Sequence, residues 1–490
     1  MEEELVSLRE HGTWKLVARA KAKRQAVITN RWVFVVKRDA QGRILRFKAR
    51  LVINGFKQQF GVDYVETFAP VIRFETIRAV ILRMHLHWQP VGFEENGGQY
   101  VCQLFKSLYG LKQAPAVWNK TLHKLLTEIG FTRLDSDYGL YAMYDPDGDV
   151  QMLLTVYVDD LLLMGPPELC YKVATQLKSA FTLTSMGEVK YLLGIEINID
   201  RTHDKIVYCQ RAYIDKILKT FNMQDAYGCW TPQSTSESKA NLKPLAPDTK
   251  LPYREIVGSL QYLVSGSRPD IAHAVRHRGK YLSCFEHKHF REAQRVLRYL
   301  KQTRDHGLHM DVVLGEKVEV TVYTDSDYAN DPDDAKSISG YITYLDGNVI
   351  SYGSRKQGIN AQSSTEAEYI AMNEGVKDIL WMDGLIEELR WPAATPLLRG
   401  DNQAALYLTA KPGKHSATKH IKNKFHLIRH LVEEGVLRTL HVSTDDNTAD
   451  IMTKPLANAK FTKFLKQLKV LHIAAAAQTD EDEQEGTQVS

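Results

Sequence analysis

The stretch LLTVYVDDLLLMG, residues 153–165, is an apolar run with two adjacent acids, Asp159 and Asp160, at its centre. Two carboxylates near a protein core are costly unless a positive group binds them. The flanking residues favour two β-strands joined by a tight turn, which would project both acids from one end of a sheet. Such a pair can hold Mg2+ against a nucleotide triphosphate. An ordinary hairpin turn is the alternative, and the long apolar flanks speak against it.

The length and composition indicate a globular protein of several domains. The 490 residues exceed one hydrophobic core, and about 150 residues per domain predicts roughly three domains. Five scattered cysteines without a CxxC pair argue against a disulfide framework and against a zinc site. The chain has no run of ~18 apolar residues and no signal peptide at its acidic amino end. We therefore expect no membrane segment and a reducing, intracellular setting.

Charge is distributed unevenly along the chain. Residues 1–60 contain 14 Lys and Arg against five acids. A basic lobe of this kind suits a phosphate backbone, although a merely soluble surface explains the charge equally well. Residues 474–490 contain five acids and no base, which predicts a disordered acidic tail.

The carboxy-terminal third has its own α/β pattern, with strands expected at 318–324, 340–345, 348–353, 397–400 and 436–443 and a long helix at 364–390. Four acids fall at strand ends and helix starts of this pattern: Asp325, Glu366, Asp401 and Asp450. Each one alone is more simply a cap or turn residue. Because such positions converge at one side of an open sheet, the four together predict a site for two metal ions.

The segment KPGKHSATKHIKNKFHLIRH, residues 411–430, contains six Lys and Arg, four His and no acid. His426 and His430 have the spacing of a helical metal pair, but no nearby Cys or acid completes a zinc site. A basic face against a nucleic-acid backbone is the better interpretation. The backbone contacts are then expected from Lys419, Lys422, Lys424 and Arg429.

A string of motifs extends this picture over residues 13 to about 470. They stand in the order RWVFVVKRDAQGRILRFKARLVINGF, GVDYVETFAPV, LFKSLYGLKQAPAVW, YVDDLLLMG, YLLGIEI, VGSLQYL, SRPDIAHAV, RVLRYLKQT, SSTEAEYIA, DNQAA and ADIMTKPL. In this order they resemble the reverse transcriptase and ribonuclease H portion of a copia-type long-terminal-repeat retrotransposon Pol polyprotein.

The resemblance implies a fold of mixed α+β and α/β class, a right-hand polymerase followed by a ribonuclease H-like domain. We expect fingers and palm in 1–230, a linker and helical thumb or connection in 231–310, the ribonuclease H-like domain in 311–473 and the acidic tail in 474–490. The implied activities are RNA-directed DNA synthesis and cleavage of RNA in RNA–DNA hybrids. The implied cofactor is Mg2+, two ions per active site, with Mn2+ as a substitute.

The resemblance also implies partners and a location. The partners are an RNA template, a DNA primer, RNA–DNA hybrid, dNTPs and other products of the polyprotein, and no membrane. The expected location is a cytoplasmic retrotransposon particle or the nucleus. The chain is then a piece of a longer polyprotein or a degenerate copy.

Residue roles follow from the motifs that match. The metal-binding and catalytic acids are Asp159 and Asp160 for the polymerase, and Asp325, Glu366, Asp401 and Asp450 for the nuclease. The incoming nucleotide and the template are expected to contact Lys48, Arg50, Tyr109, Gly110, Lys112 and Gln113.

One expected element of the polymerase is missing from the sequence. The family's third catalytic acid comes from a strand before LYGLKQAP, in a sequence resembling QMDVKTAFLNG. This chain has only 22 residues between Arg78 and Val101, and no Asp between Asp63 and Asp135. We therefore predict an incomplete palm near residues 84–89 and an impaired polymerase. A catalytically dead relic that still binds nucleic acid is the alternative for the whole chain.

Overall fold

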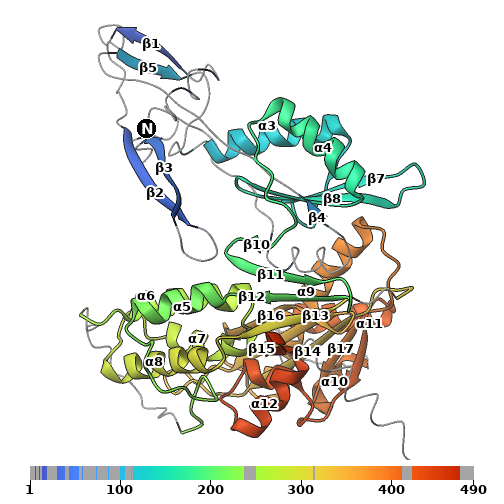
Figure 1. Ribbon diagram of the computed structural model, residues 1–490. Helices are drawn as coiled ribbons and strands as arrows, with labels where there is room; N and C mark the ends of the chain where they lie inside the picture. Colours follow the sequence, from blue (N-terminus) through green and yellow to red (C-terminus); the bar gives the residue numbers. More distant parts are fainter. Residues whose placement is uncertain are drawn as a thin grey trace, which may run out of the picture. The chain divides into compact units, whose positions relative to one another are not determined.

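The computed structural model describes residues 14–18, 30–38, 44–53, 86–87, 100–104, 114–236, 250–312, 315–410 and 422–474, with a few single positions between them (Figure 1). The chain forms two compact units. Unit 1 comprises Met1–Arg73 and His85–Glu188, and unit 2 comprises Phe74–Met84 and Val189–Ser490. The predicted domain boundaries at 230 and 310 therefore both fall inside unit 2, and the division lies after Glu188.

Unit 1 is built around a five-stranded antiparallel sheet. Its strand order is β4 (Leu86–His87), β9 (Asp160–Met164), β8 (Val150–Tyr157), β7 (Leu140–Tyr144) and β6 (Thr132–Arg133). Helices α3 (Ala114–Ile129) and α4 (Pro167–Ala180) pack against it. The core contains Leu122 and Leu126 from α3, Val173 from α4, and Met152 and Leu154 from β8. The expected strand–turn–strand at residues 153–165 is confirmed.

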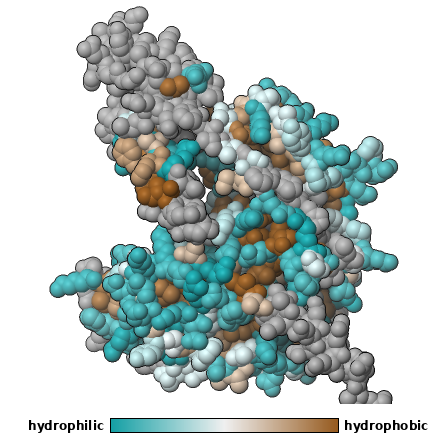
Figure 2. Space-filling view, in the orientation of Figure 1, coloured by the Kyte–Doolittle hydropathy of each residue, from teal (hydrophilic) through white to brown (hydrophobic). Residues whose placement is uncertain are grey.

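Two further strand pairs belong to unit 1. Strand β2 (Asn30–Arg38) pairs antiparallel with β3 (Ile44–Ile53). Strand β1 (Trp14–Ala18) pairs with β5 (Tyr100–Leu104). Hydrophobic surface is visible over the β2–β3 hairpin in Figure 2, where Phe34 and Phe47 are exposed.

The first sheet of unit 2 joins segments from both ends of that unit. Its antiparallel order is β10 (Tyr191–Leu192), β11 (Ile195–Asp200), β12 (Lys205–Cys209), β13 (His306–Asp311) and β19 (Val470–His472). The helical part of the unit consists of α5 (Arg211–Thr220), α6 (Tyr253–Gly266), η3 (Pro269–Ile271), α7 (Ala272–Gly279) and α8 (His287–Gln302). The expected helical part of residues 231–310 corresponds to α6, α7 and α8, whereas β13 and β19 were not predicted.

The second sheet of unit 2 has the order β16 (Asn348–Lys356), β15 (Ile338–Leu345), β14 (Val320–Asp327), β17 (Leu397–Gly400) and β18 (Arg438–His441). The first three strands are antiparallel, and β14, β17 and β18 are parallel. The accompanying helices are α9 (Ser364–Glu388), α10 (Gln403–Ala410), α11 (Lys422–Glu433), η4 (Thr448–Met452) and α12 (Asn458–Gln467). The predicted strands and the long helix are confirmed within a few residues.

Two glycines show which elements cover the faces of this sheet. A Cβ on Gly375 of α9 would lie 2.7 Å from the Thr324 side chain of β14, so α9 packs closely on that face. A Cβ on Gly340 of β15 would lie 2.7 Å from Met452, which brings η4 onto the opposite face. Alternate residues of a strand point to opposite faces. Asp325 pairs with Gly340, so the Cβ of Asp325 lies on the face of the sheet that η4 covers.

No helix among the described residues is both long and apolar enough to cross a membrane.

Candidate active sites

In unit 1, Val158 and Asp159 form the turn between β8 and β9, because Tyr157 pairs directly with Asp160. Val158 has a φ of 56°, a conformation that is rare for a β-branched residue. The indole N–H of Trp118 in α3 donates to the Val158 carbonyl oxygen at 2.7 Å. The turn that carries the two acids is thus strained and tied to a neighbouring helix, as functional turns often are.

The two acids of this turn are exposed, so the burial cost expected from the sequence does not arise. A guanidinium nitrogen of Arg50 lies 4.0 Å from the Asp159 carboxylate. Lys48 is two residues before Arg50 in β3, and residues at this spacing share one face of a strand. Unit 1 therefore brings the predicted acid pair and a predicted base of the finger strand together.

The remaining predicted residues of unit 1 are only partly described. The Lys112 ammonium donates to the Gln58 carbonyl oxygen at 3.3 Å, and the Lys112 backbone N–H donates to the Gln58 side chain at 2.8 Å. Tyr109, Gly110 and Gln113 lie outside the described residues, as does most of the segment 84–98.

Strand β4 occupies the position next to β9, but it pairs with only Leu163 and Met164 of that strand. Within the described residues no third acid joins Asp159 and Asp160 to form a group of metal ligands.

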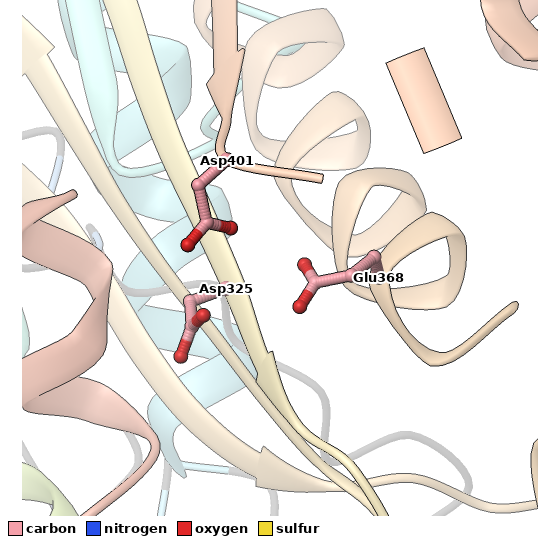
Figure 3. Close-up of side chains that lie close together, drawn as sticks. All are labelled: Asp325, Glu368 and Asp401. Carbon is pink, nitrogen blue, oxygen red and sulfur yellow. The ribbon is translucent and has the colours of Figure 1, made fainter. Parts of the chain in front are cut away.

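In unit 2, three acids converge on one point from two strands and a helix (Figure 3). Asp325 comes from β14, Glu368 from α9, and Asp401 follows the end of β17. One carboxylate oxygen of each lies within 4.8 Å of the others. Asp325 and Glu368 are buried and Asp401 is half-buried. The Ser326 N–H of β14 donates to Glu368 at 3.2 Å and thereby ties the helix to the strand.

The electrostatics of this cluster favour a bound cation. Burial, together with the negative charges of Asp325 and Asp401, raises the pKa of Glu368 to about 9. Burial raises the pKa of Asp325 to about 7, against the opposing effect of the Lys454 ammonium. Buried carboxylates at this separation cannot all ionise without a compensating charge. Mg2+ prefers oxygen ligands of this kind, so the donor set fits a divalent ion.

Glu366, the acid predicted from the sequence, is not part of the cluster. Ser363 caps α9 by accepting from the Glu366 N–H at 3.2 Å, and the Glu366 carboxylate accepts from the Gln362 N–H at 2.7 Å. Ser363 and Glu366 are thus the N-cap and N3 residues of an S-x-x-E sequence, and the Glu366 carboxylate is held at the start of the helix by the residue before the cap. Because successive helical residues are about 100° apart, Glu368 points to a different side of α9 and reaches the cluster instead. The prediction that Glu366 joins the group of acids was therefore wrong by two residues, and the capping motif at residues 363–366 was the signal that could have corrected it.

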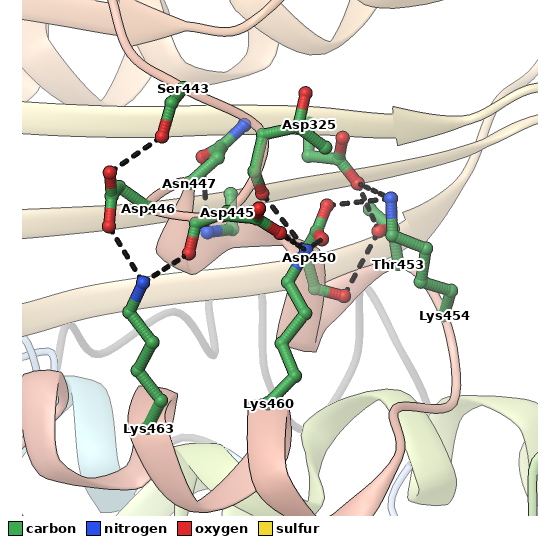
Figure 4. A network of polar contacts seen from close by, with 12 residues as sticks. Asp325, Ser443, Asp445, Asp446, Asn447, Asp450, Thr453, Lys454, Lys460 and Lys463 are labelled. Carbon is green, nitrogen blue, oxygen red and sulfur yellow. Dashed lines mark hydrogen bonds and ion pairs between the residues drawn. The ribbon is translucent and has the colours of Figure 1, made fainter.

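Asp450, the fourth predicted acid, lies beside Asp325 in a network with two lysines (Figure 4). Its carboxylate is fully buried, with the Lys454 ammonium at 2.6 Å and the Lys460 ammonium at 2.8 Å. Lys454 also lies 3.5 Å from Asp325, and the Thr453 hydroxyl donates to Asp325. Asp450 is thus neutralised by protein cations and lies outside the group of three acids. The structure brings together two of the four predicted nuclease acids, with Glu368 as the third.

The basic segment is only partly described. Lys419 lies outside the described residues, and so do the side chains of Lys422 and Lys424 at the start of α11. Arg429 is buried, and its guanidinium donates to the Leu408 carbonyl oxygen at 3.3 Å. The prediction that Arg429 contacts a nucleic-acid backbone from an exposed helix face is therefore wrong, because this side chain packs inward against α10.

Solved structures with a similar course of the chain include two kinds of enzyme. A foamy viral protease–reverse transcriptase in complex with double-stranded DNA covers 87% of this chain, and the match covers 81% of that chain, with a TM-score of 0.44 and 12% identity. The ribonuclease H1 LC11 in complex with an RNA/DNA hybrid covers 30% of this chain, and the match covers 99% of that chain, with a TM-score of 0.22 and 22% identity. Because these TM-scores are below 0.5, the family assignment rests on the sequence relatives.

The sequence relatives are retrotransposon proteins. Residues 11–88 and 81–235 match the family described as reverse transcriptase (RNA-dependent DNA polymerase). The Pol polyprotein of transposon RE1 from Arabidopsis thaliana is 36% identical over 94% of this chain, and that of transposon TNT 1-94 from Nicotiana tabacum is 34% identical over 96%. The chain spans about a third of the length of both, 33% and 37%.

A shorter relative is matched over nearly its whole length. The putative transposon Ty5-1 protein of Saccharomyces cerevisiae is 34% identical, and the match covers 94% of that protein and 59% of this chain. Together with the order of the motifs, these matches show that the chain belongs to the copia-type retrotransposon Pol polyproteins, in their reverse transcriptase region.

Proposed function

We propose that unit 2 cleaves the RNA strand of RNA–DNA hybrids, and that unit 1 derives from a polymerase that copies RNA into DNA from a DNA primer and dNTPs. The observation that carries the nuclease function is the convergence of Asp325, Glu368 and Asp401 on one point. By family, the chain would act beside other products of the polyprotein, in a cytoplasmic particle or in the nucleus.

The residues of unit 2 have distinct parts in this proposal. Asp325, Glu368 and Asp401 would hold Mg2+, and Mn2+ in its place, and the ion would supply a water of lowered pKa and charge stabilisation for phosphodiester hydrolysis. The Ser326 N–H fixes the Glu368 carboxylate, so two of the three ligands are positioned by a strand and a helix, and Asp401 directly follows the end of β17. Selectivity for hybrids would come from 2′-hydroxyl contacts on the RNA strand and backbone contacts on the DNA strand.

The test of the nuclease proposal is hybrid cleavage by the full chain with Mg2+ or Mn2+. The chain should cut the RNA of a hybrid and spare a DNA duplex of the same sequence. Asp401→Asn should abolish cutting while leaving hybrid binding in place. A wild-type chain that binds hybrid but never cuts it with either ion would replace this proposal with the nucleic-acid-binding relic.

For the polymerase we propose that activity is impaired by a missing palm segment near residues 84–89. Two observations support this. The family match breaks into two pieces that overlap at residues 81–88, and β4, which pairs with the end of β9 away from the Asp159–Asp160 turn, is two residues long and carries no acid. Two exposed carboxylates without the third hold a metal too weakly or in the wrong place for phosphoryl transfer.

Primer extension on poly(rA)–oligo(dT) tests this second part. The full chain should give no product with Mg2+ or Mn2+. Product that disappears in Asp159→Asn would show that the palm is complete without the missing segment.

A further inference from the structure

A groove of about 920 Å3 lies in unit 2 between helices α6 and α7 and the edge strand β16. Four of the residues that line it are bases, and none is an acid. The bases come from three elements: Arg254 from α6, Arg276 and the adjacent Lys280 from α7, and Arg355 from β16. The groove is separate from the acid cluster and from the basic segment at residues 411–430.

The four bases are neutralised to different extents. Lys280 lies 2.7 Å from Asp331, and Arg355 lies 3.4 Å from Glu374. Neither Arg254 nor Arg276 forms an ion pair with any residue that the structure describes. The Nε of Arg276 is buried without a hydrogen-bond partner in the described part of the chain, and burial lowers the pKa of this guanidinium to about 10. A guanidinium in this condition is stabilised by an anion that reaches it.

The sheet register fixes where the groove lies relative to the acid cluster. Asp325 of β14 pairs with Gly340 of β15, and Gly340 pairs with Ser354 of β16, which lines the groove. Neighbouring strands are about 4.8 Å apart, so the Asp325 and Ser354 backbones are about 10 Å apart. Residues that are paired directly across strands have their side chains on the same face of the sheet, so the Cβ atoms of Asp325 and Ser354 lie on one face.

Helix α6 covers that face at the groove, since the Tyr352 hydroxyl donates to the Val264 carbonyl oxygen. A distance of about 10 Å corresponds to the rise of roughly three base pairs along the axis of the hybrid, at about 3.4 Å each.

We propose that this groove holds the sugar–phosphate backbone of the hybrid about three nucleotides from the point of cleavage. The inference rests on the proposed nuclease function and names a surface that would align its substrate. Arg254 and Arg276 on two adjacent helices suit phosphates that recur along a strand, whereas the Arg355 guanidinium is directed to the α9 face of β16, where it pairs with Glu374. A free triphosphate shares the phosphate chemistry, and the experiment separates the two.

The test measures hybrid binding by the full chain in EDTA, so that cleavage plays no part. Fluorescence anisotropy of a labelled 18-base-pair hybrid is recorded between 50 and 200 mM salt for the wild type, Arg254→Gln and Arg254→Gln/Arg276→Gln. Each lost phosphate contact lowers the slope of log affinity against log salt by about one. The single variant should therefore lose about one unit of slope and the double variant about two.

Arg291→Gln is the matched control, because Arg291 is an exposed arginine of α8 in the same unit and does not line the groove. It should leave the slope unchanged, and thermal unfolding should confirm that all variants are folded. A slope for Arg254→Gln equal to that of the control would overturn the inference.

A second arm titrates inorganic tripolyphosphate. Loss of tripolyphosphate binding in Arg254→Gln with an unchanged hybrid slope would assign the groove to a small phosphate ligand and also overturn the inference. Cleavage by the wild type together with an unchanged slope would reject the groove alone. Altered slopes without any cleavage would reject the nuclease function alone.

Discussion

Replacing Glu368 by Gln should stabilise unit 2 at alkaline pH in the absence of metal. Glu368 is buried beside Asp325 and Asp401, and its pKa is raised from 4.5 to about 9. The folded chain therefore keeps a proton on this carboxyl at pH 7, whereas the unfolded chain releases it above pH 4.5. The free energy of unfolding is therefore undiminished below pH 4.5, the pKa of Glu368 in the unfolded chain. It falls as the pH rises toward about 9, the pKa of Glu368 in the folded chain.

The size of the effect follows from linkage. One retained proton costs about 1.4 kcal/mol per pH unit, so between pH 5.5 and 8.5 the wild type should lose on the order of 4 kcal/mol through Glu368. The raised pKa of Asp325, about 7, adds a loss of the same sign that ends near pH 7. In Glu368→Gln the first contribution disappears, and the amide oxygen can still accept from the Ser326 N–H.

The assay is urea unfolding of the full chain in EDTA at pH 5.5, 7.0 and 8.5, with pulse proteolysis read out on unit 2 peptides. The wild-type midpoint should fall with pH and recover when Mg2+ is added. The Glu368→Gln midpoint should fall less and respond little to Mg2+. A wild-type midpoint that stays flat with pH, or a Glu366→Gln control that behaves as Glu368→Gln does, would refute the reasoning.

Three further predictions concern the units and their contacts. Limited proteolysis should release a fragment beginning near residue 189 and none beginning near 310, because β13 pairs with both β12 and β19; a protected fragment from 310 onward would contradict this. Lys454→Gln should bind Mn2+ more tightly than the chain with Lys454 does in an Asp159→Asn/Asp160→Asn background. The reason is that the Lys454 ammonium, 2.6 Å from Asp450 and 3.5 Å from Asp325, competes with the metal ion for these carboxylates. An unchanged Mn2+ affinity, measured by electron paramagnetic resonance, would rule this out. Trp118→Phe removes the indole N–H that donates to the Val158 carbonyl oxygen. The turn should lose about 1 kcal/mol of local stability, which amide hydrogen exchange at residues 157–160 would report as faster exchange. Unchanged exchange would show that the turn keeps its conformation without this hydrogen bond.

Much of the fold was predictable because local patterns agree with the tertiary structure. The two strands flanking the acids in 153–165 and the strands expected at 318–324, 340–345 and 348–353 appear within a few residues of where they were expected. Strands β13 and β19 were missed because short strands depend on distant partners, and β19 pairs with a segment more than 150 residues earlier. The division after Glu188 escaped prediction for the same reason, since β11 and β12 continue into β13.

The candidate site was predictable in kind but not in every residue. Asp325 lies near the end of β14 and Asp401 directly follows β17, and the ends of neighbouring parallel strands lie at the same edge of a sheet whatever the side-chain details. The choice between Glu366 and Glu368 depends on helix phase, which the cap at Ser363 sets. Whether Asp450 is available for a metal depends on Lys454 and Lys460, and ion pairs of this kind arise from tertiary packing rather than from the motif alone.

The most direct test of the nuclease site compares Glu366→Gln with Glu368→Gln in hybrid cleavage by the full chain with Mg2+. The two substitutions make the same chemical change two residues apart on one helix. Glu368→Gln should lower the cleavage rate at least about 100-fold, because loss of a metal ligand costs no less than loss of a residue that supports one. Glu366→Gln should stay within a few-fold of the wild type, since its carboxylate accepts from the Gln362 N–H and lies outside the group of three acids. Loss of cleavage in Glu366→Gln with full activity in Glu368→Gln would contradict the site described here.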